Sequence, residues 1–429
     1  MAELAECAPT LYRRLFWPIL APSLLIGVAG GATVPVQVLA AMQLGASASL
    51  AAAIVAILGG IGLATTVHAG RLIDRVGDKH AMLLATTVIG SFTLVTVAAL
   101  AWGGRGALAL FMAASFGRAP AMNVWSLARQ AYTADHVEAH EVGRAMTALG
   151  GTMRVGNLIG PLVGGVLLLW LPLWSVYVLS VACAVLAVAI LYSPTGAVAE
   201  GPSTSSGNGM KSSLAGSGDS PAKPVEATLM VGVRWSAVIL AGVAITTLAV
   251  ARVTQPVIVQ LWGVSVGLDE SSISLLIAVG AAIEIVLMFP GGYLKDRLGR
   301  AVILVTCLLV YGSGFLLMVP LTRWLGIPGM VLAVVVMAVG NGLGAGVNMT
   351  IGADLSPAQG RGRFLGVWAL FSNVGVLGGP LLISLLVATA SVQAAVLAIG
   401  AVAVVGAGWM AIFAARIGLP KGIGRDRLS

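Results

Sequence analysis

The stretch Gly70–Lys79 reads GRLIDRVGDK and forms a charged island between two long apolar segments. A closely similar stretch, Gly292–Arg300, reads GYLKDRLGR, so both share the pattern G-x-L-x-D-R-x-G. The two copies are offset by 222 residues in a chain of 429 residues. A charged motif that returns after half a chain indicates that the protein is built from a duplicated unit.

The composition is that of a membrane protein. The chain is 58% hydrophobic and 9% charged, with 56 glycines and a mean hydropathy of +0.99, whereas soluble chains are about 25% charged. Abundant glycine suits transmembrane helices, because small residues let helix backbones approach closely. The three scattered cysteines show no spacing typical of metal ligands. We expect no metal and no other cofactor.

Apolar segments long enough to cross a bilayer recur along the whole chain. A transmembrane helix needs about 20 mostly apolar residues, and twelve segments qualify. The sequence therefore predicts an all-α membrane protein with twelve transmembrane helices in two six-helix halves. The segments are 16–41, 50–69, 81–102, 107–128, 145–170, 173–193, 236–262, 271–291, 301–320, 330–353, 364–388 and 391–415.

Four regions follow from this pattern. Residues 1–193 form the predicted N-terminal half and residues 236–415 the predicted C-terminal half. Residues 194–235 are rich in glycine, serine and proline, a composition typical of a flexible linker, and we interpret them as a tether on the cytoplasmic side. Residues 416–429 form a predicted cytoplasmic tail.

The basic residues are distributed unequally across the predicted membrane. Of 24 lysines and arginines, 19 lie on the side that holds both termini, two on the opposite side and three inside predicted helices. Positive residues accumulate in cytoplasmic loops, so we expect both termini to be cytoplasmic and the protein to lie in the cell (plasma or inner) membrane. The same asymmetry explains the net charge of +8, and nucleic acid is therefore not expected as a partner.

The repeat extends beyond the opening motif. Gly156 and Pro161 recur as Gly375 and Pro380, each offset by 219 residues. Because each half has an even number of predicted helices, both copies have the same orientation and are related by an axis along the membrane normal. Parallel repeats of this kind place a substrate site near the midplane, between the halves.

The doubled G-x-L-x-D-R-x-G motif and the six-plus-six arrangement resemble the major facilitator superfamily over nearly the whole chain. In the fifth predicted helix, residues 156–165 read GNLIGPLVGG, which is similar to the superfamily element g-x-x-x-G-P-x-x-G-G associated with proton-coupled exporters, especially of drugs. The alternative is a proline kink with small-residue helix packing. The residues that match this exporter motif are Gly156, Gly160, Pro161, Gly164 and Gly165.

Two positions depart from the family pattern. Asp78 stands where the family motif usually has a basic residue. In the fourth helix the exporters have an arginine followed four residues later by a glycine, whereas Arg118 is followed by Met122. The proton-relay role that the family gives to the helix-4 arginine is therefore not transferred to Arg118.

Four charged residues lie inside the predicted spans: Glu284, Arg118, Arg154 and Arg252. A charge at the centre of a helix costs about 2.5–3.5 kcal/mol on the insertion scale, so each should face a cavity or a partner. The resemblance implies that all four lie on helices that line or flank the cavity. Glu284 is either the proton- or substrate-coupling group or the partner of Arg252 in a permanent ion pair.

The excess of intramembrane arginines bears on the substrate. Arg118 and Arg154 have no acidic partner in the sequence pattern, so we expect the cavity to favour an anionic, zwitterionic or neutral polar substrate over an organic cation. Asn123, Gln255 and Asn341 are further cavity candidates. Each is as well suited to a hydrogen bond between helices as to a substrate contact.

The family resemblance implies that the two motif copies act as a conformational latch. Asp74 and Arg75 should meet the opposite half when the cytoplasmic side is shut, and the glycines at 70 and 77 should permit a tight turn. The predicted latch residues are Gly70, Asp74, Arg75, Gly77, Gly292, Asp296, Arg297, Gly299 and Arg300.

The sequence therefore predicts a secondary transporter that works by alternating access, not an enzyme. It contains no phosphate-binding G-x-x-x-x-G-K-[ST] motif, so a proton gradient is the expected energy source. The first interpretation is proton-coupled efflux of small molecules by a monomer in the lipid bilayer. One alternative is an importer or facilitator of a sugar-like or carboxylated solute. Another, of a different class, is a membrane sensor or scaffold that does not transport.

Overall fold

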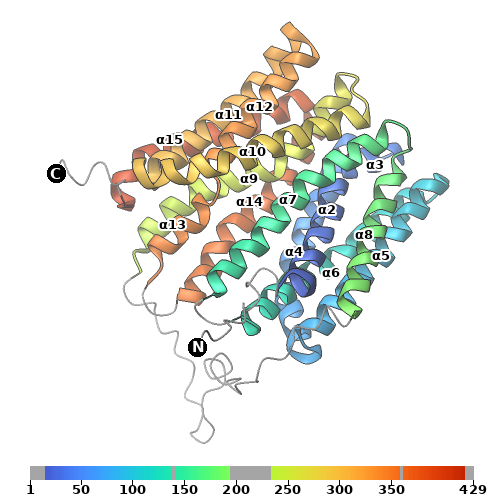
Figure 1. Ribbon diagram of the computed structural model, residues 1–429. Coiled ribbons are helices and arrows are strands. Elements are labelled where there is room, and N and C mark those ends of the chain that lie inside the picture. Colours follow the sequence, from blue (N-terminus) through green and yellow to red (C-terminus); the bar gives the residue numbers. More distant parts are fainter. Residues whose placement is uncertain (1–14, 138–140, 194–232, 358–360, 421–429) are drawn as a thin grey trace, which may run out of the picture.

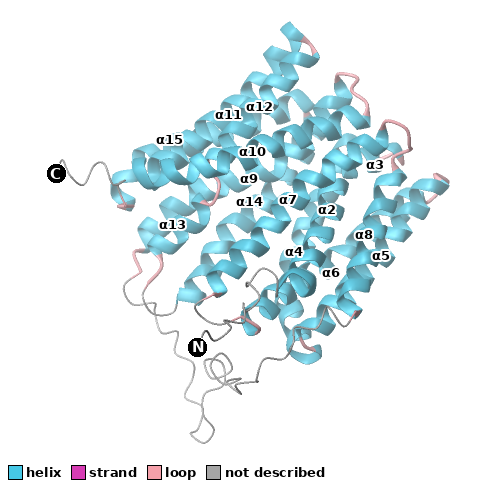
Figure 2. Cartoon of the chain, viewed as in Figure 1, coloured by secondary structure: helices cyan, strands magenta, loops and turns pink. Residues whose placement is uncertain are grey.

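The structure is a computed structural model that describes residues 15–137, 141–193, 233–357 and 361–420. These residues form helices and connecting loops, without a β-strand among them (Figures 1 and 2). The predicted linker at 194–235 lies outside the described residues except at its last positions, and so do the first 14 residues and most of the tail.

Each half contains six membrane-crossing units, and they follow one another along the chain (Figure 1). In the first half, the first unit is made of four consecutive helices: η1 (Phe16–Leu20), α2 (Ala21–Thr33), η2 (Val34–Val36) and α3 (Gln37–Gln43). The other five units are single helices: α4 (Ala48–Val76), α5 (Asp78–Trp102), α6 (Ala107–Asp135), α7 (Val142–Leu168) and α8 (Trp174–Tyr192). In the second half, five units are single helices: α9 (Trp235–Ser265), α10 (Glu270–Leu298), α11 (Arg300–Leu325), α14 (Arg361–Thr389) and α15 (Val392–Ile417). The remaining unit, the tenth of the chain, is made of α12 (Ile327–Leu343) and α13 (Val347–Leu355).

Eleven of these units are long and apolar enough to cross a membrane among the described residues. The exception is α6, which occupies the fourth position but carries more polar residues. It is also longer than the predicted span of 107–128 and continues to Asp135. As a consequence Arg129, the first residue after the predicted span, is buried within α6, with its guanidinium 4.7 Å from the ring centre of Trp125.

The two copies of the opening motif are mostly helical, which corrects the prediction of a loop. Gly70 and Gly292 lie inside α4 and α10 and do not belong to a turn. The chain breaks at Gly77 and Gly299 instead, where φ is +83° and +92°. Glycine adopts such values without steric cost. A single glycine therefore separates α4 from α5 and α10 from α11.

Two membrane-crossing units are interrupted within the bilayer region. In the first unit the π-helix η1 precedes α2, and the 3₁₀-helix η2, which contains Pro35, separates α2 from α3. In the tenth unit α12 ends at Leu343 and α13 begins at Val347, with Gly346 at φ +74° between them. Interrupted helices leave carbonyl groups without their usual helical partners, which makes both interruptions relevant to a polar site.

The packing within each half repeats with the sequence offset. A methyl group on Gly156 of α7 would lie 2.6 Å from the carbonyl carbon of Gly27 in α2. A methyl group on Gly375 of α14 would lie 2.7 Å from the carbonyl oxygen of Thr246 in α9. Gly375 and Thr246 follow Gly156 and Gly27 by the same 219 residues, so the sequence duplication is also a structural one.

The halves meet through α4 against α14 and through α7 against α10. Among the described residues, the hydrogen bonds between the halves all lie toward the end opposite Gly77 and Gly299. We call this the closed end, and the end with Gly77 and Gly299 the latch end. The bonds are Val38 N to Gln260 Oε1 at 3.0 Å, Gln260 Nε2 to Val34 O at 3.0 Å, Ser274 Oγ to Pro161 O at 2.9 Å and Ser384 Oγ to Ser49 O at 2.8 Å.

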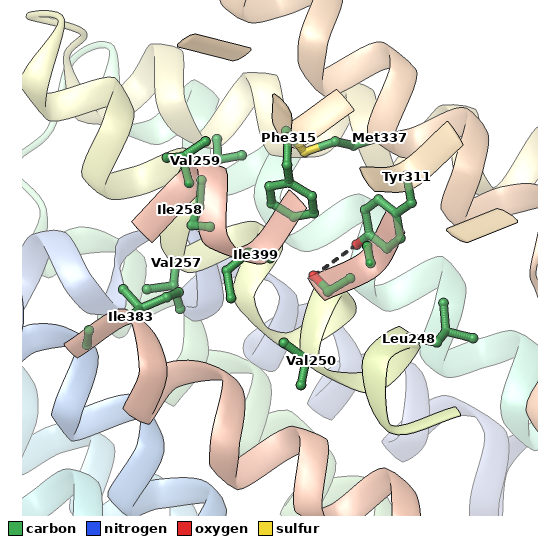
Figure 3. Close-up of a cluster of buried hydrophobic side chains, with 14 of the residues drawn as sticks. Leu248, Val250, Val257, Ile258, Val259, Tyr311, Phe315, Met337, Ile383 and Ile399 are labelled. Carbon is green, nitrogen blue, oxygen red and sulfur yellow. Dashed lines mark hydrogen bonds between the residues drawn. The ribbon is translucent and has the colours of Figure 1, made fainter. Parts of the chain in front are cut away.

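The second half has the more extensive apolar core. Phe315 and Tyr311 of α11 are fully buried against α9, and Ile399 of α15 contributes to the same cluster (Figure 3). Because lipid tails are as apolar as these side chains, it is their close packing that stabilises this cluster. Tyr311 brings a hydroxyl group into this apolar region, and the dashed line in Figure 3 leaves that hydroxyl.

Candidate functional site

A cavity of about 240 Å³ lies between the two halves. Its wall combines apolar side chains with a small set of polar ones, which is the usual composition of a small-molecule site. The lining residues are Gly31, Val34, Pro35, Asn157, Pro161, Arg252, Gln255, Pro256, Val259, Ile277, Ala281, Glu284, Val334 and Asn341. The sequence predictions Arg252, Gln255, Glu284 and Asn341 thus meet in one place.

Arg252 is held by two acceptors from the tenth unit. Its Nε donates to Oδ1 of Asn341 at 2.7 Å, and its Nη2 donates to the carbonyl of Gly344 at 2.9 Å. Gly344 lies in the interruption between α12 and α13. The same carbonyl also accepts from the backbone nitrogen of Val347 at 3.2 Å, so it bonds both the guanidinium and the start of α13.

Glu284 of α10 lies beside this arrangement, half-buried. Its carboxyl group is in hydrogen-bonding reach of the side chains of Asn341 and Gln255, and it interacts electrostatically with Arg252 and Arg154. No ion pair within 4 Å joins Glu284 to Arg252 in the described part of the chain. The geometry differs from the simple ion pair of the sequence alternative, because Asn341 contacts both groups.

Arg154 also has an acidic neighbour, contrary to the prediction from its sequence context. It belongs to α7 of the first half, whereas Glu284 belongs to α10 of the second. The sequence pattern of each helix taken separately does not indicate that Arg154 and Glu284 interact, because their proximity depends on how α7 and α10 pack together. Glu284 consequently has an arginine from each half within electrostatic range.

Tyr311 is a site residue that the sequence predictions missed. It lies in α11, and its hydroxyl contacts both Oε1 of Gln255 and the carbonyl of Ala251, the latter at 3.3 Å. It fixes the amide of Gln255 from the side remote from the cavity. A buried tyrosine inside an apolar helix is a weak signal in sequence alone, because tyrosine occurs equally at membrane interfaces.

Arg118 lies apart from the central cavity. It lines a second cavity, of about 370 Å³, between α3, α4 and α6 of the first half. Asn123 lines the same cavity, but its Nδ2 donates to the carbonyl of Gly62 at 2.7 Å and to Oγ1 of Thr66 at 3.1 Å. Asn123 therefore joins α6 to α4.

The residues of the exporter motif form close helix contacts. Methyl groups on Gly156 and Gly160 would lie within 2.4–2.6 Å of the backbone of α2, whereas one on Gly164 would have its nearest neighbour at 3.6 Å. Gly165 approaches Leu275 of α10, and the carbonyl of Pro161 accepts the hydrogen bond from Ser274. The motif therefore contacts its own half at one end and the opposite half at the other.

The charged residues of the predicted latch lie at the latch end and, where they have partners, pair within their own half. Asp74, Arg75, Asp296 and Arg297 are exposed at the latch end. Arg300 forms ion pairs of 3.6 Å with Asp296 and 3.1 Å with Asp354, and Arg297 lies 4.8 Å from the ring centre of Tyr293. The contact across the halves that the latch hypothesis requires is not found among the described residues and stays a prediction.

This fold and this site define a class. A multi-pass helical membrane protein with duplicated six-helix halves and a polar cavity between them has the architecture of a membrane transporter. The sequence profile of the Major Facilitator Superfamily matches residues 11–251 and 240–425. The chain therefore belongs to the Major Facilitator Superfamily of transporters. No curated protein matches the chain in sequence.

Solved transporter structures share the fold at low sequence identity. A POT family transporter in complex with thioalcohol conjugated peptide has a TM-score of 0.72 at 11% identity, covering 93% of this chain and 96% of that one. The peptide transporter POT in complex with sulfate has a TM-score of 0.70 at 15% identity and 95% coverage of both chains. A D-xylose-proton symporter has a TM-score of 0.69 at 14% identity, covering 94% and 97%.

Proposed function

We propose that this transporter is driven by protons and works by alternating access, with Glu284 as the group that takes up and releases the proton. The supporting observation is that Glu284 interacts electrostatically with an arginine of each half, more strongly with Arg252 than with Arg154. Ionised Glu284 attracts Arg154 across the interface and favours approach of α7 and α10. A proton on Glu284 removes that attraction, so that protonation and the relative position of the halves are linked.

Asn341 carries this link to the second half. Its Oδ1 accepts from Arg252, and its amide lies in reach of Glu284. When Glu284 gains a proton, its carboxyl group acquires one O–H donor and still accepts through its other oxygen. Its interaction with the Asn341 amide then weakens, because the carboxyl group has lost its charge. Because Asn341 lies directly before the interruption between α12 and α13, this weakening acts on the segment most able to bend.

Export is the first candidate direction. It is supported by the exporter motif at 156–165, which contacts the opposite half through Pro161 and Gly165. We further propose that the latch end faces the cytoplasm of a cell membrane, as the distribution of basic residues indicates. A single chain forms both walls of the cavity, so the transporter works as a monomer.

Uptake is the second candidate direction. It is favoured by the structural likeness to a D-xylose-proton symporter and by electrostatics, because a proton on Glu284 makes the cavity region more positive. An anionic solute and a proton would then bind together. The two directions differ in the sign of the proton coupling, which is measurable.

The experiment uses proteoliposomes with 4-phenylbutanoate, D-xylose and ethidium as probes. Accumulation driven by an acidic lumen indicates antiport, and accumulation driven by an acidic exterior indicates symport, after subtraction of protein-free liposomes. In either case Glu284→Gln should abolish gradient-driven accumulation and retain exchange of the probe across the membrane. Equal gradient-driven accumulation by Glu284→Gln and the unsubstituted protein would contradict the proposal.

A further inference from the structure

The second cavity lies directly beside the central one. Gly31, Val34 and Pro35 line the central cavity, and Gln37, two residues further on, lines the second. The η2 segment thus borders both cavities. Val34 projects an exposed apolar side chain (44% exposed) toward the central cavity, while Gln37 brings an amide to the second.

Several hydrogen-bond donors around the second cavity have no acceptor. The guanidinium of Arg118 forms neither a hydrogen bond nor an ion pair with any described residue. Nε2 of Gln37 is buried without a partner, and so is the hydroxyl of Tyr177 in α8. Tyr177 interacts electrostatically with Arg118. Native structures satisfy nearly all buried polar groups, so the two buried donors without a partner, Gln37 Nε2 and the Tyr177 hydroxyl, require an explanation.

The cavity also lacks a negative charge. None of its lining residues is acidic: besides Arg118 and Gln37 they include Ser115, Asn123 and Ser126 with apolar neighbours. Glu284 interacts with Arg252 and Arg154, which leaves Arg118 uncompensated. A half-buried cation at membrane depth without a counter-charge is costly, so the site favours a ligand that brings the negative charge with it.

We propose that Arg118 and Gln37 form a subsite for the carboxylate of an amphipathic monocarboxylate substrate. This inference rests on the transport function proposed above and holds for either direction. The planar guanidinium matches a carboxylate in a two-bond geometry, and Nε2 of Gln37 supplies a further donor. One arginine balances one negative charge, which favours a carboxylate over a doubly charged phosphate monoester.

The neighbouring central cavity accommodates the rest of the substrate. Its wall near η2 contains Val34, Pro256, Val259 and Ile277, which suit an apolar body. The two cavities, about 370 and 240 Å³, together fall within the range of small-molecule sites. Tyr177 interacts electrostatically with Arg118 and lines neither cavity.

The test measures binding to the purified full-length protein in detergent, without a gradient. The midpoint of thermal unfolding is followed against 4-phenylbutanoate, with 4-phenylbutanamide and 4-phenylbutylamine as analogues that lack the carboxylate. The acid should raise the midpoint in a saturable way, and the amide and amine should not. Arg118→Gln should weaken binding of the acid by at least about tenfold.

Two further variants keep the test decisive. Gln37→Met removes one donor at similar volume and should weaken acid binding about two- to tenfold, which also serves if Arg118→Gln does not fold. Arg105→Gln, an exposed arginine remote from the cavity, should bind as the unsubstituted protein does. Equal binding of acid and amide, no binding of the acid up to its solubility limit, or unchanged binding by Arg118→Gln would each overturn the proposal.

Failure of this inference is distinguishable from failure of the proposed function. If carboxylate selectivity is absent but Glu284-dependent, gradient-driven flux of another probe is present, the subsite is wrong and proton coupling stands. If the acid binds through Arg118 but no probe responds to a pH gradient, the subsite stands and the proton coupling is wrong.

Discussion

Nε of Arg252 donates a 2.7 Å hydrogen bond to Oδ1 of Asn341 across the interface between α9 and α12. The same asparagine lies in reach of Glu284 of α10. Three helices of the second half are therefore connected through one amide group. An asparagine suits this position because it offers both an acceptor and two donors, and neither a carboxylate nor an amine does so at every pH.

Asn341→Leu tests this connection. The substitution keeps the volume but leaves Nε of Arg252 without its acceptor, and an unsatisfied charged donor costs about 1–3 kcal/mol. We expect gradient-driven transport in proteoliposomes to fall about tenfold or more. Asn348→Leu is the control, because Asn348 bonds Ser372 and Trp368 outside the central cavity. It should lower thermal stability and spare transport per folded molecule, and equal transport by both variants would argue against the connection.

Gly160 and Gly164 form a matched pair on α7. A methyl group on Gly160 would lie 2.4 Å from the backbone nitrogen of Ala32 and 2.5 Å from the carbonyl oxygen of Val28, so Gly160→Ala forces α7 away from α2. Overpacking of this kind costs about 1–3 kcal/mol. Gly164→Ala has room, with its nearest neighbour at 3.6 Å, and gains up to about 1 kcal/mol in helix propensity.

Thermal unfolding in detergent should therefore move in opposite directions for the two variants. Gly160→Ala should unfold at a lower temperature than the unsubstituted protein, and Gly164→Ala at an equal or higher one. Identical unfolding temperatures would show that the close approach of α7 and α2 at Gly160 does not limit stability.

The membrane fold was predictable from the sequence because it rests on local and periodic features. Apolar length identifies a span without knowledge of its neighbours, and the motif copies at Gly77 and Gly299 mark the same short connection in both halves. The loop prediction for Gly70 and Gly292 was wrong because the charged residues that suggested solvent lie on helical turns that extend beyond the apolar segment. Charged residues indicate that a segment is exposed to water, and the exposed end of a helix meets that condition as well as a loop does.

Most polar residues of the central cavity were predictable from the sequence, but the contacts between them were not. Glu284, Arg252, Gln255 and Asn341 were predicted separately, because intramembrane polar groups are costly enough to require a purpose. That Asn341 contacts both charged groups depends on tertiary packing. The role of the Gly344 carbonyl depends on the interruption between α12 and α13, for which the glycines at 340, 342, 344 and 346 were an available signal. The approach of Arg154 to Glu284 depends on contact between the two halves.

The N-cap of α10 should depend on pH in a way that the other caps do not. Hydrogen bonds from Ser271 and Ser272 lower the pKa of Asp269 from 3.8 to about 2. Because the folded-state pKa lies below the unfolded value, this cap stabilises the protein above about pH 4 and loses its contribution as the pH falls toward about 2. Asp269→Asn retains a capping oxygen but cannot titrate.

The measurement compares thermal unfolding of Asp269→Asn and the unsubstituted protein between neutral pH and about pH 2.5. The difference between them should change only below about pH 4. Ser391→Ala removes the neutral cap of α15 and should cost about 1 kcal/mol at every pH. A difference between Asp269→Asn and the unsubstituted protein that is constant with pH would contradict the lowered pKa.

Asp74 tests the latch hypothesis, because it is exposed while the described hydrogen bonds between the halves lie toward the closed end. If Asp74 stabilises the state in which the latch end is shut, by an attraction of about 0.3–1 kcal/mol to a helix N-terminus, Asp74→Asn should shift the population about two- to fivefold toward the state open at that end. Transport should fall, and binding of the transported probe should remain.

Spin labels at Val76→Cys and Leu298→Cys report this shift directly. The two positions are exposed (40% and 48%) and equivalent in the duplicated motif, and Cys183 and Cys307 are buried. The distance distribution between the labels should move toward longer distances in Asp74→Asn, and Asp296→Asn should act in the same direction because the motif is repeated. Loss of probe binding with an unchanged distribution would instead place Asp74 in the substrate path, and it would remove the reason for treating the two motif copies as conformational elements.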